Sequence, residues 1–160
     1  MDKRKKITIS DVAAELNISS TVVSMVLNGR AKKYRISESV EQKVRDKAKE
    51  MGYQPNCLAQ SLRTGKTRTI GLILGDVSNP FFAKIASCVE KEAARYNYQV
   101  MFASSDESSE KFERAAQMFL SKQVDGLIVA PTENSEKIIM DIMKNRKPVV
   151  LIDRIVGGIP

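Results

Sequence analysis

The sequence predicts a small all-α domain followed by an α/β domain built on a parallel sheet. Between residues 10 and 52, apolar side chains recur every three or four positions, which is typical of amphipathic helices. From residue 69 onward, short apolar runs alternate with helical segments, which is the pattern of βαβ units.

The net charge of the sequence changes at the same place. Residues 1–69 contain fifteen Lys and Arg against seven Asp and Glu, a net charge of +8, whereas residues 70–160 contain eleven against twelve, a net charge of −1. A basic segment joined to a near-neutral body suits a module that binds a polyanion, although a solvated lysine-rich surface has the same composition.

Length and composition exclude several classes of protein. A chain of 160 residues has room for one ordinary domain or for a small domain plus part of a larger one, and the second option fits the charge division better. No apolar run is long enough to span a bilayer, and no secretory signal follows the charged start, so we expect a cytoplasmic protein. The absence of histidine excludes histidine-based catalytic triads and the common zinc sites. Cys57 and Cys88 are too few for a disulfide framework and lack metal-ligand spacing, so we expect no metal, cofactor or catalytic residue.

Two short helices joined by a tight turn are predicted at the start of the chain. In the first, Ser10 is the expected N-cap, and Asn17 interrupts the helix. In the second, Ser19 is the expected N-cap of residues 20–27, and Gly29 suits a left-handed cap at the end. This arrangement is the skeleton of a helix-turn-helix, although plain helical bundles contain similar hairpins. The second helix would expose four side chains near the end at which a recognition helix reads base edges, namely Ser20, Thr21, Ser24 and Met25.

A third helix is predicted from Ser37, with an apolar stripe that runs to Met51 and with Gly52 as its end. It would complete a three-helix core.

A short fourth helix is predicted over residues 56–62. Pro55 suits the first turn of this helix, Asn56 is a candidate cap, and Gly65 stops the segment. Isolated helices shorter than ~12–15 residues are marginal in water, so something must hold this one in place. From the spacing alone, an ordinary linker with a nascent helix is the preferred interpretation.

The remaining segments suit a parallel sheet covered on both faces by helices. Strands are predicted at residues 69–74, 98–103, 126–130 and 149–152, and helices at residues 81–96, 110–122 and 135–145.

Ligands of such sheets bind beyond the carboxyl ends of the strands. Those ends carry an aromatic pair, several carboxylates and an arginine, which suits a polyol or a sugar. A structural role stays open, because Asn79 and Pro80 also suit a helix cap and Phe81 a core position. No G-x-G-x-x-G motif and no Walker-type phosphate loop occurs, so a nucleotide-binding enzyme has little support.

Three motifs near the start resemble the lactose/galactose-repressor family. They are ITISDVA at residues 7–13, SSTVVSMVLN at residues 19–28 and GYQPN at residues 52–56. The family pattern reads T-I-x-D-V-A, S-x-x-T-V-S-R-V-L-N and G-Y-x-P-N. The resemblance covers essentially the whole chain, because it continues in the same order through residues 58–62, 69–73 and 124–126.

The resemblance implies a bacterial transcription regulator, a repressor of a metabolic operon. It would bind a palindromic operator in double-stranded DNA as a homodimer, under the control of a small-molecule effector that we expect to be a sugar. The implied domains are a helix-turn-helix headpiece (residues 1–54), a hinge helix and linker (55–68) and a partial effector domain (69–160). That last domain would be an incomplete, periplasmic-binding-protein-like N-subdomain. The alternative is a non-specific architectural DNA-binding protein, while an α/β enzyme with a basic tail lacks any nucleophile–base pair or metal cluster.

The resemblance also implies binding residues. In the family, the hinge helix pairs with that of the dimer mate in the minor groove, where a leucine wedge kinks the DNA. Leu62 matches the wedge, Ala59 lies beside it and Leu58 would face the mate. Phe82 is the expected stacking ring for the effector, and Asp153 the expected acceptor for its hydroxyls. The expected DNA-binding residues are Thr8, Ser10, Ser19, Ser20, Thr21, Ser24, Met25, Asn28, Lys32, Lys33, Tyr53, Asn56, Ala59 and Leu62. The expected effector-binding residues are Asp76, Phe81, Phe82, Ser105, Asp106, Asp153 and Arg154.

Two departures from the family pattern affect the expected DNA site. Met25 stands where the family has an arginine, and Val22 where it has a threonine. Arginine can grip guanine through two hydrogen bonds, whereas methionine can make only apolar contact, for example with a thymine methyl. The connection over residues 29–35 is longer than in the family and rich in cations, which suit either phosphate contacts or a solvated loop.

Overall fold

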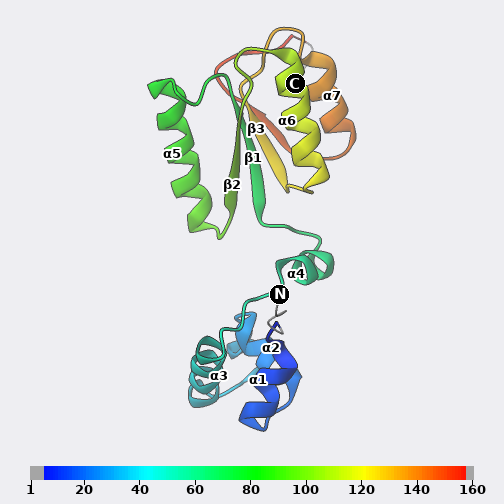
Figure 1. Ribbon diagram of the computed structural model, residues 1–160. Helices are drawn as coiled ribbons and strands as arrows, with labels where there is room; N and C mark the ends of the chain where they lie inside the picture. The colour runs from blue at the N-terminus through cyan, green and yellow to red at the C-terminus, as the bar shows by residue number, and fades with distance from the viewer. Residues whose placement is uncertain (1–5, 158–160) are drawn as a thin grey trace, which may run out of the picture. The chain divides into compact units, whose positions relative to one another are not determined.

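The computed structural model describes residues 6–157, apart from the side chains of Cys57 and Leu58. The chain separates into two compact units, Met1–Asn56 and Cys57–Pro160. The first unit, which we call the headpiece, contains α1 (Ile9–Leu16), α2 (Ser20–Leu27), the 3-10 helix η1 (Lys32–Tyr34) and α3 (Glu38–Glu50) (Figure 1). The second unit contains α4 (Cys57–Thr64), β1 (Thr69–Leu74), α5 (Pro80–Arg95), β2 (Gln99–Ser104), α6 (Ser109–Ser121), β3 (Gly126–Val129), α7 (Glu136–Lys144) and β4 (Val149–Leu151).

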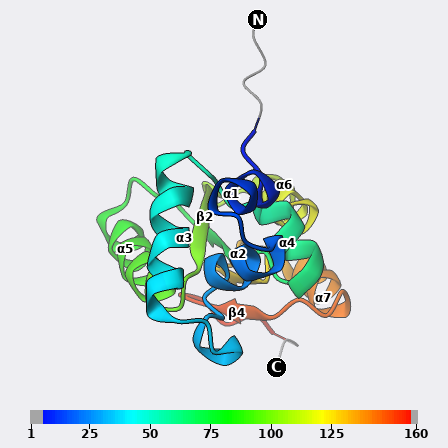
Figure 2. The same ribbon diagram turned by 90° about the horizontal axis from the view of Figure 1, so that it is seen from below.

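The headpiece is built around one small apolar core, which confirms the predicted three-helix arrangement. Val12 of α1, Val23 and Val26 of α2 and Val44 of α3 are all fully buried in it. Figure 2 shows the three helices α1, α2 and α3 grouped together. Burying one such side chain contributes roughly 1.5–3 kcal/mol, so the unit depends on only a few residues.

The helix starts are set by polar caps. The hydroxyl of Thr8 accepts a hydrogen bond from the Asp11 amide (3.3 Å), and the Asp11 carboxylate accepts one from the Thr8 amide (2.8 Å), which forms a capping box. The prediction that Ser10 caps α1 is therefore wrong, because the helix begins one residue before it. The predicted cap at Ser19 is confirmed, since its hydroxyl accepts from the Val22 amide (3.3 Å).

The second unit contains a four-stranded parallel sheet, as the sequence pattern predicts, and the structure gives the strand order β2-β1-β3-β4. Helix α5 covers one face, and α6 and α7 cover the other (Figure 1). Strand β1 serves both faces: Leu72 and Leu74 pack in the cluster under α5, and Ile73 packs in the cluster under α6 and α7. Gly71 permits close packing against α6, because an added Cβ would lie 2.5 Å from Cδ2 of Phe119.

The fourth helix is confirmed but runs two residues further than predicted, to Thr64. Its end is set by Gly65, whose positive φ of 68° suits glycine and whose amide donates to the Ser61 carbonyl (2.8 Å). Pro55 lies before the helix and not in its first turn, because the helix begins at Cys57. That part of the prediction is wrong.

Candidate nucleic-acid interface and ligand-binding edge

Helix α2 presents a polar but uncharged surface. Ser20 and Thr21 are exposed, while Ser24 and Met25 are half-buried. The helix contains no charged residue along its whole length. Its end is fixed by Asn28, whose side-chain amide donates to the Ser24 carbonyl (2.6 Å) and hydroxyl (3.2 Å). The exposed residues can therefore contact base edges or phosphates by hydrogen bonding and apolar contact, but not by charge.

The other expected DNA-binding residues of the headpiece differ in their exposure and in the structural roles of their side chains. Thr8 and Ser19 are exposed, but their hydroxyls already cap helices. Tyr53 packs against the headpiece core, and this partial burial raises the pKa of its hydroxyl. Ser10 and Asn56 are exposed, as are Lys32 and Lys33 of η1.

Helix α4 carries an exposed leucine. Leu62 has 88% of its surface open, and Ala59 is exposed as well. The expectation for Leu58 concerns a side chain that lies outside the described part of the chain. Large apolar side chains with so much open surface are candidates for contact with another molecule.

The linker after α4 is tied to the sheet by one carboxylate, which the sequence analysis did not single out. Asp125, just before β3, accepts hydrogen bonds from the Thr67 amide (2.8 Å), the Thr67 hydroxyl (3.0 Å) and the Arg68 amide (3.1 Å). Partial burial alone would raise the pKa of Asp125, but these hydrogen bonds outweigh it and hold the pKa below the ordinary value. The guanidinium of Arg68 also lies 5.7 Å from the centre of the Tyr98 ring. The anchor fixes the point at which the linker enters β1.

Asp125→Asn should lower the stability of the second unit by about 1–2 kcal/mol at neutral pH, because the charged acceptor is lost. The folded-state pKa of Asp125 lies below the unfolded value, so its stabilising effect is present above that value. The effect disappears as the pH falls through the folded-state pKa. The stability gap between the variant and the unchanged chain should therefore shrink in acid, as thermal unfolding followed by circular dichroism would show. Asp141→Asn is the matched control, since it removes only an exposed pair with Lys144 and should have little effect. A gap that stays constant down to about pH 3 would contradict the role of the charge.

The aromatic pair at the ligand-binding edge is arranged differently from the expectation. Phe82 is only 7% exposed and packs in the core under α5, whereas Phe81 is 54% exposed. Their burial is thus opposite to the predicted arrangement, because Phe82 shares the buried face of α5 with Ala86 and Ala93. The cap formed by Asn79 is real: its side-chain oxygen accepts from the Phe81 amide (2.9 Å). Phe81 is therefore the ring that a ligand could reach.

The charged residues of this edge form local groups. The Asp76 carboxylate accepts from the Ser78 hydroxyl and amide, and these hydrogen bonds lower the pKa of Asp76. Across the sheet end, Arg154 pairs with Glu107 (2.8 Å) and lies 3.7 Å from Asp153.

Glu107 was not among the expected effector residues, although it directly follows one of them in the same loop. The Glu107 carboxylate lies close against Gly75, because a Cβ added to this glycine would be only 2.5 Å from it.

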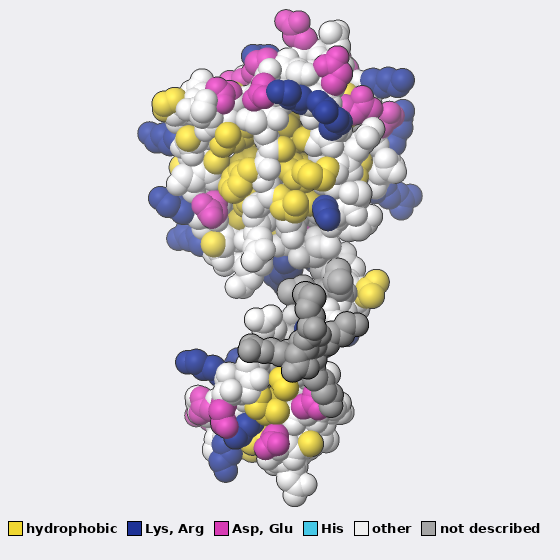
Figure 3. All heavy atoms as spheres, viewed as in Figure 1, with side chains coloured by type: hydrophobic (Ala, Val, Ile, Leu, Met, Phe, Trp, Pro, Cys, Tyr) yellow, Lys and Arg dark blue, Asp and Glu magenta, His cyan; other side chains and the backbone are white. Residues whose placement is uncertain are grey.

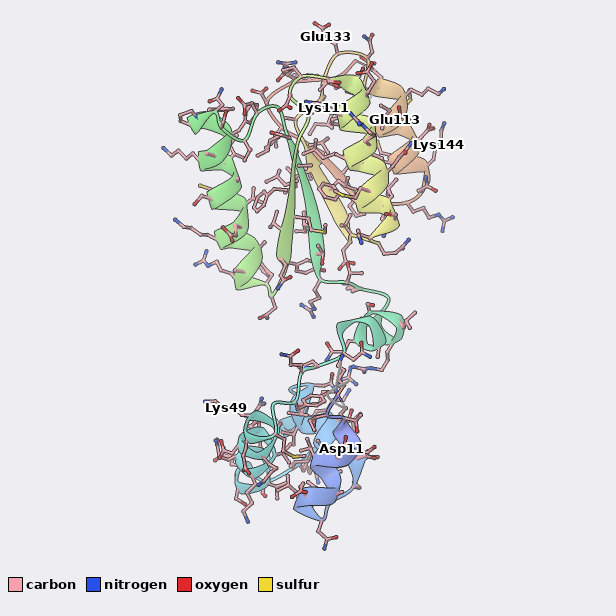
Figure 4. All side chains as sticks on the ribbon, in the orientation of Figure 1. Asp11, Lys49, Lys111, Glu113, Glu133 and Lys144 are labelled. Atoms are coloured by element: carbon pink, nitrogen blue, oxygen red, sulfur yellow. The ribbon has the colours of Figure 1, made fainter. Side chains whose placement is uncertain are left out.

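The loops after β2 and β3 add further polar groups. Asp106 pairs with Lys111, which Figure 4 labels near the start of α6. Ser105 is fully buried and its hydroxyl donates to the Leu74 carbonyl (3.1 Å), so its side chain supports the loop. Thr132 is 5% exposed, and its hydroxyl has no hydrogen-bond partner among the described residues. Buried hydroxyls are paired in most native structures, so Thr132 joins the candidate ligand contacts.

Within residues 6–157, no group of three His, Cys, Asp or Glu side chains is arranged to hold a metal ion. The helices of that same stretch are also too short or too polar to cross a membrane.

A compact three-helix headpiece joined to a parallel α/β unit defines a class of two-part proteins with a helical domain and an α/β domain, and comparison with known proteins identifies the family. Residues 8–56 match "Bacterial regulatory proteins, lacI family", and residues 67–158 match "Periplasmic binding proteins and sugar binding domain of LacI family". The chain belongs to the LacI family of bacterial regulatory proteins.

Three similar proteins illustrate the relationship. Catabolite control protein A of Priestia megaterium is 36% identical over 145 residues, which cover 91% of this chain and 43% of that protein. A LacI-family transcriptional regulator from Silicibacter pomeroyi has a TM-score of 0.77 at 27% identity, covering 96% of this chain and 45% of that one. The Cra transcriptional dual regulator of Pseudomonas putida, solved in complex with fructose 1-phosphate, has a TM-score of 0.54 at 34% identity, covering 56% and 34%. The chain thus spans a little under half the length of the curated relatives that it matches.

Proposed function

We propose that this chain is the DNA-binding part of a sequence-specific transcription repressor, which acts in the cytoplasm and binds a palindromic operator. The observation that carries the proposal is helix α2, which exposes Ser20 and Thr21 at its N-terminal end on a compact, basic three-helix unit. A recognition helix contacts base edges with these positions. The family match over residues 8–56 supports the same conclusion.

We infer that the protein binds DNA as a homodimer. Helix α4 has only eight residues, which is too short to be stable alone, so a second copy and a DNA groove would stabilise it. Two headpieces related by a two-fold axis would match two halves of a palindrome. Hydrophobic side chains also gather between α5 and α6 on the side of the second unit where β2 forms the sheet edge (Figure 3). Phe102 of the edge strand β2 is 43% exposed, which suits contact with another protein surface.

We propose an uncharged sugar or polyol as the effector. The edge beyond the strands carries five carboxylates, those of Asp76, Asp106, Glu107, Glu133 and Asp153. Its two cations, Lys111 and Arg154, already pair with carboxylates. Such a surface favours hydroxyl groups and disfavours a phosphate ester. In a longer version that carries a second subdomain, neutral sugars should therefore alter the affinity of the protein–operator complex in a titration, while their phosphate esters should not. A response to phosphate esters alone would overturn this assignment.

Selection of binding sites from a random DNA library tests the main proposal. A sequence-specific repressor should recover a palindrome and prefer it over random duplex by ~10³-fold or more at physiological salt. A non-specific architectural protein would bind all duplexes alike, and that result would replace the proposal by this alternative.

Met25→Arg should shift the base preference toward guanine at one position of each half-site. Arginine can donate two hydrogen bonds to guanine, which is worth about 1–3 kcal/mol of discrimination, whereas methionine offers only apolar contact. Competition between site variants would measure the shift. Met25→Leu is the matched control, because it keeps the apolar contact and should retain the original preference. If both variants read the same bases as the unchanged chain, then α2 does not face the groove in the proposed way.

A further inference from the structure

The turn after the recognition helix is ordered by its own backbone. The Arg30 amide donates to the Met25 carbonyl (2.8 Å), and the Ile36 amide donates to the Ala31 carbonyl (3.0 Å). Ala31 is only 2% exposed and packs in the headpiece core, so its side chain anchors the turn to that core. The exposed side chains of Arg30 and of residues 32–35 are therefore held on a backbone that hydrogen bonds and core packing order.

This turn, which we call the basic turn, concentrates unpaired positive charge. Arg30, Lys32, Lys33 and Arg35 are all exposed, and none of them forms an ion pair or a side-chain hydrogen bond with the described residues. The sequence contains no acidic residue between Glu15 and Glu38, so no neighbour along the chain neutralises them.

In helix α3, by contrast with the basic turn, cations are paired with carboxylates. There Arg45 pairs with Glu41 (2.6 Å), and Lys47 pairs with Glu50 (2.7 Å). The excess charge of the described headpiece is therefore uneven: α2 has none, and the basic turn that follows it has four cations within six residues.

Affinity for DNA depends on charge that α2 lacks. Neutralisation of phosphates by Lys and Arg supplies essentially all of non-specific binding and much of specific binding. The basic turn begins three residues after α2 ends, within the same rigid core. It also exposes the ring of Tyr34, whose hydroxyl can donate to a phosphate oxygen.

We propose that the basic turn binds phosphates of the DNA backbone beside the groove that α2 reads, and that it supplies the charge absent from α2. This inference rests on the proposed function and assigns one part of it to a specific segment. Phosphate contacts position a protein on the duplex but carry no direct sequence information. The basic turn should therefore set affinity and salt dependence, while α2 sets base preference.

The test compares two double variants of the full chain on a random-sequence duplex over a series of salt concentrations. Lys32→Gln with Lys33→Gln removes two cations of the basic turn, and Lys43→Gln with Lys49→Gln removes two exposed cations of α3, where Figure 4 labels Lys49. Each lost phosphate contact lowers the slope of log affinity against log salt by about 0.9. The basic-turn variant should lose about two units of slope, while the α3 variant should keep the slope of the unchanged chain.

Three outcomes separate the possibilities. Loss of slope in the basic-turn variant alone, with unchanged base preference on a selected site and unchanged thermal unfolding, supports the inference. Equal slopes for the unchanged chain and the basic-turn variant, or equal losses in the two variants, would overturn it while leaving the proposed function intact. If the unchanged chain binds no duplex at any salt concentration, the proposed function itself fails.

Discussion

Removal of residues 1–65 should abolish binding to duplex DNA. The first 69 residues carry a net charge of +8, and residues 70–160 carry −1. A fragment that begins at Lys66 keeps the bonds of Thr67 and Arg68 to Asp125, so the start of β1 stays anchored. It loses the headpiece and α4, which hold thirteen Lys and Arg against seven Asp and Glu, and it keeps a net charge of only +1. Fluorescence anisotropy with a labelled duplex at low and physiological salt would measure the loss.

The fragment must be shown to fold before its failure to bind is informative. Its sheet and its two buried clusters lie wholly within the second unit, so its circular dichroism should retain the α/β signal. If this folded fragment bound duplex as tightly as the full chain, the division into a DNA-binding headpiece and a separate α/β unit would be wrong.

Leu62→Ala should weaken binding to a selected operator about 100-fold, which corresponds to about 2.7 kcal/mol. Apolar wedges such as leucine insert between base steps in the minor groove, where the unstacking cost is repaid by contacts on the bent DNA. The side chain is 88% exposed, so its truncation removes little internal packing and should leave stability almost unchanged.

Binding to random duplex should fall much less, because a wedge acts only where the sequence allows the groove to open. Leu62→Met is the matched control, since methionine is also found as a wedge and conserves volume. Equal losses of affinity on operator and on random duplex would rule out insertion. A Leu62→Met variant as weak as Leu62→Ala would instead point to a requirement for the shape of leucine.

Local patterns in the sequence determined most of the architecture. Helix caps such as Ser19, the apolar stripe of each helix and the alternation of strands and helices depend on residues only a few positions apart. The three headpiece helices and the parallel sheet could therefore be predicted, with errors of one or two residues at the ends of elements. Thr8 replaces Ser10 as a cap within this margin, because both residue types suit the position.

The tertiary structure decided which candidate residues are exposed to solvent and which form hydrogen bonds or ion pairs with residues distant in the sequence. The rotation of α5 on the sheet buries Phe82 and exposes Phe81, although the spacing of Phe82, Ala86 and Ala93 could have indicated the buried face. The bonds from Thr67 and Arg68 to Asp125 span almost sixty residues, and the pair between Arg154 and Glu107 joins two separate loops. Contacts of this kind leave no periodic signal in the sequence, because they arise only when parallel strands bring distant loops to the same end of the sheet.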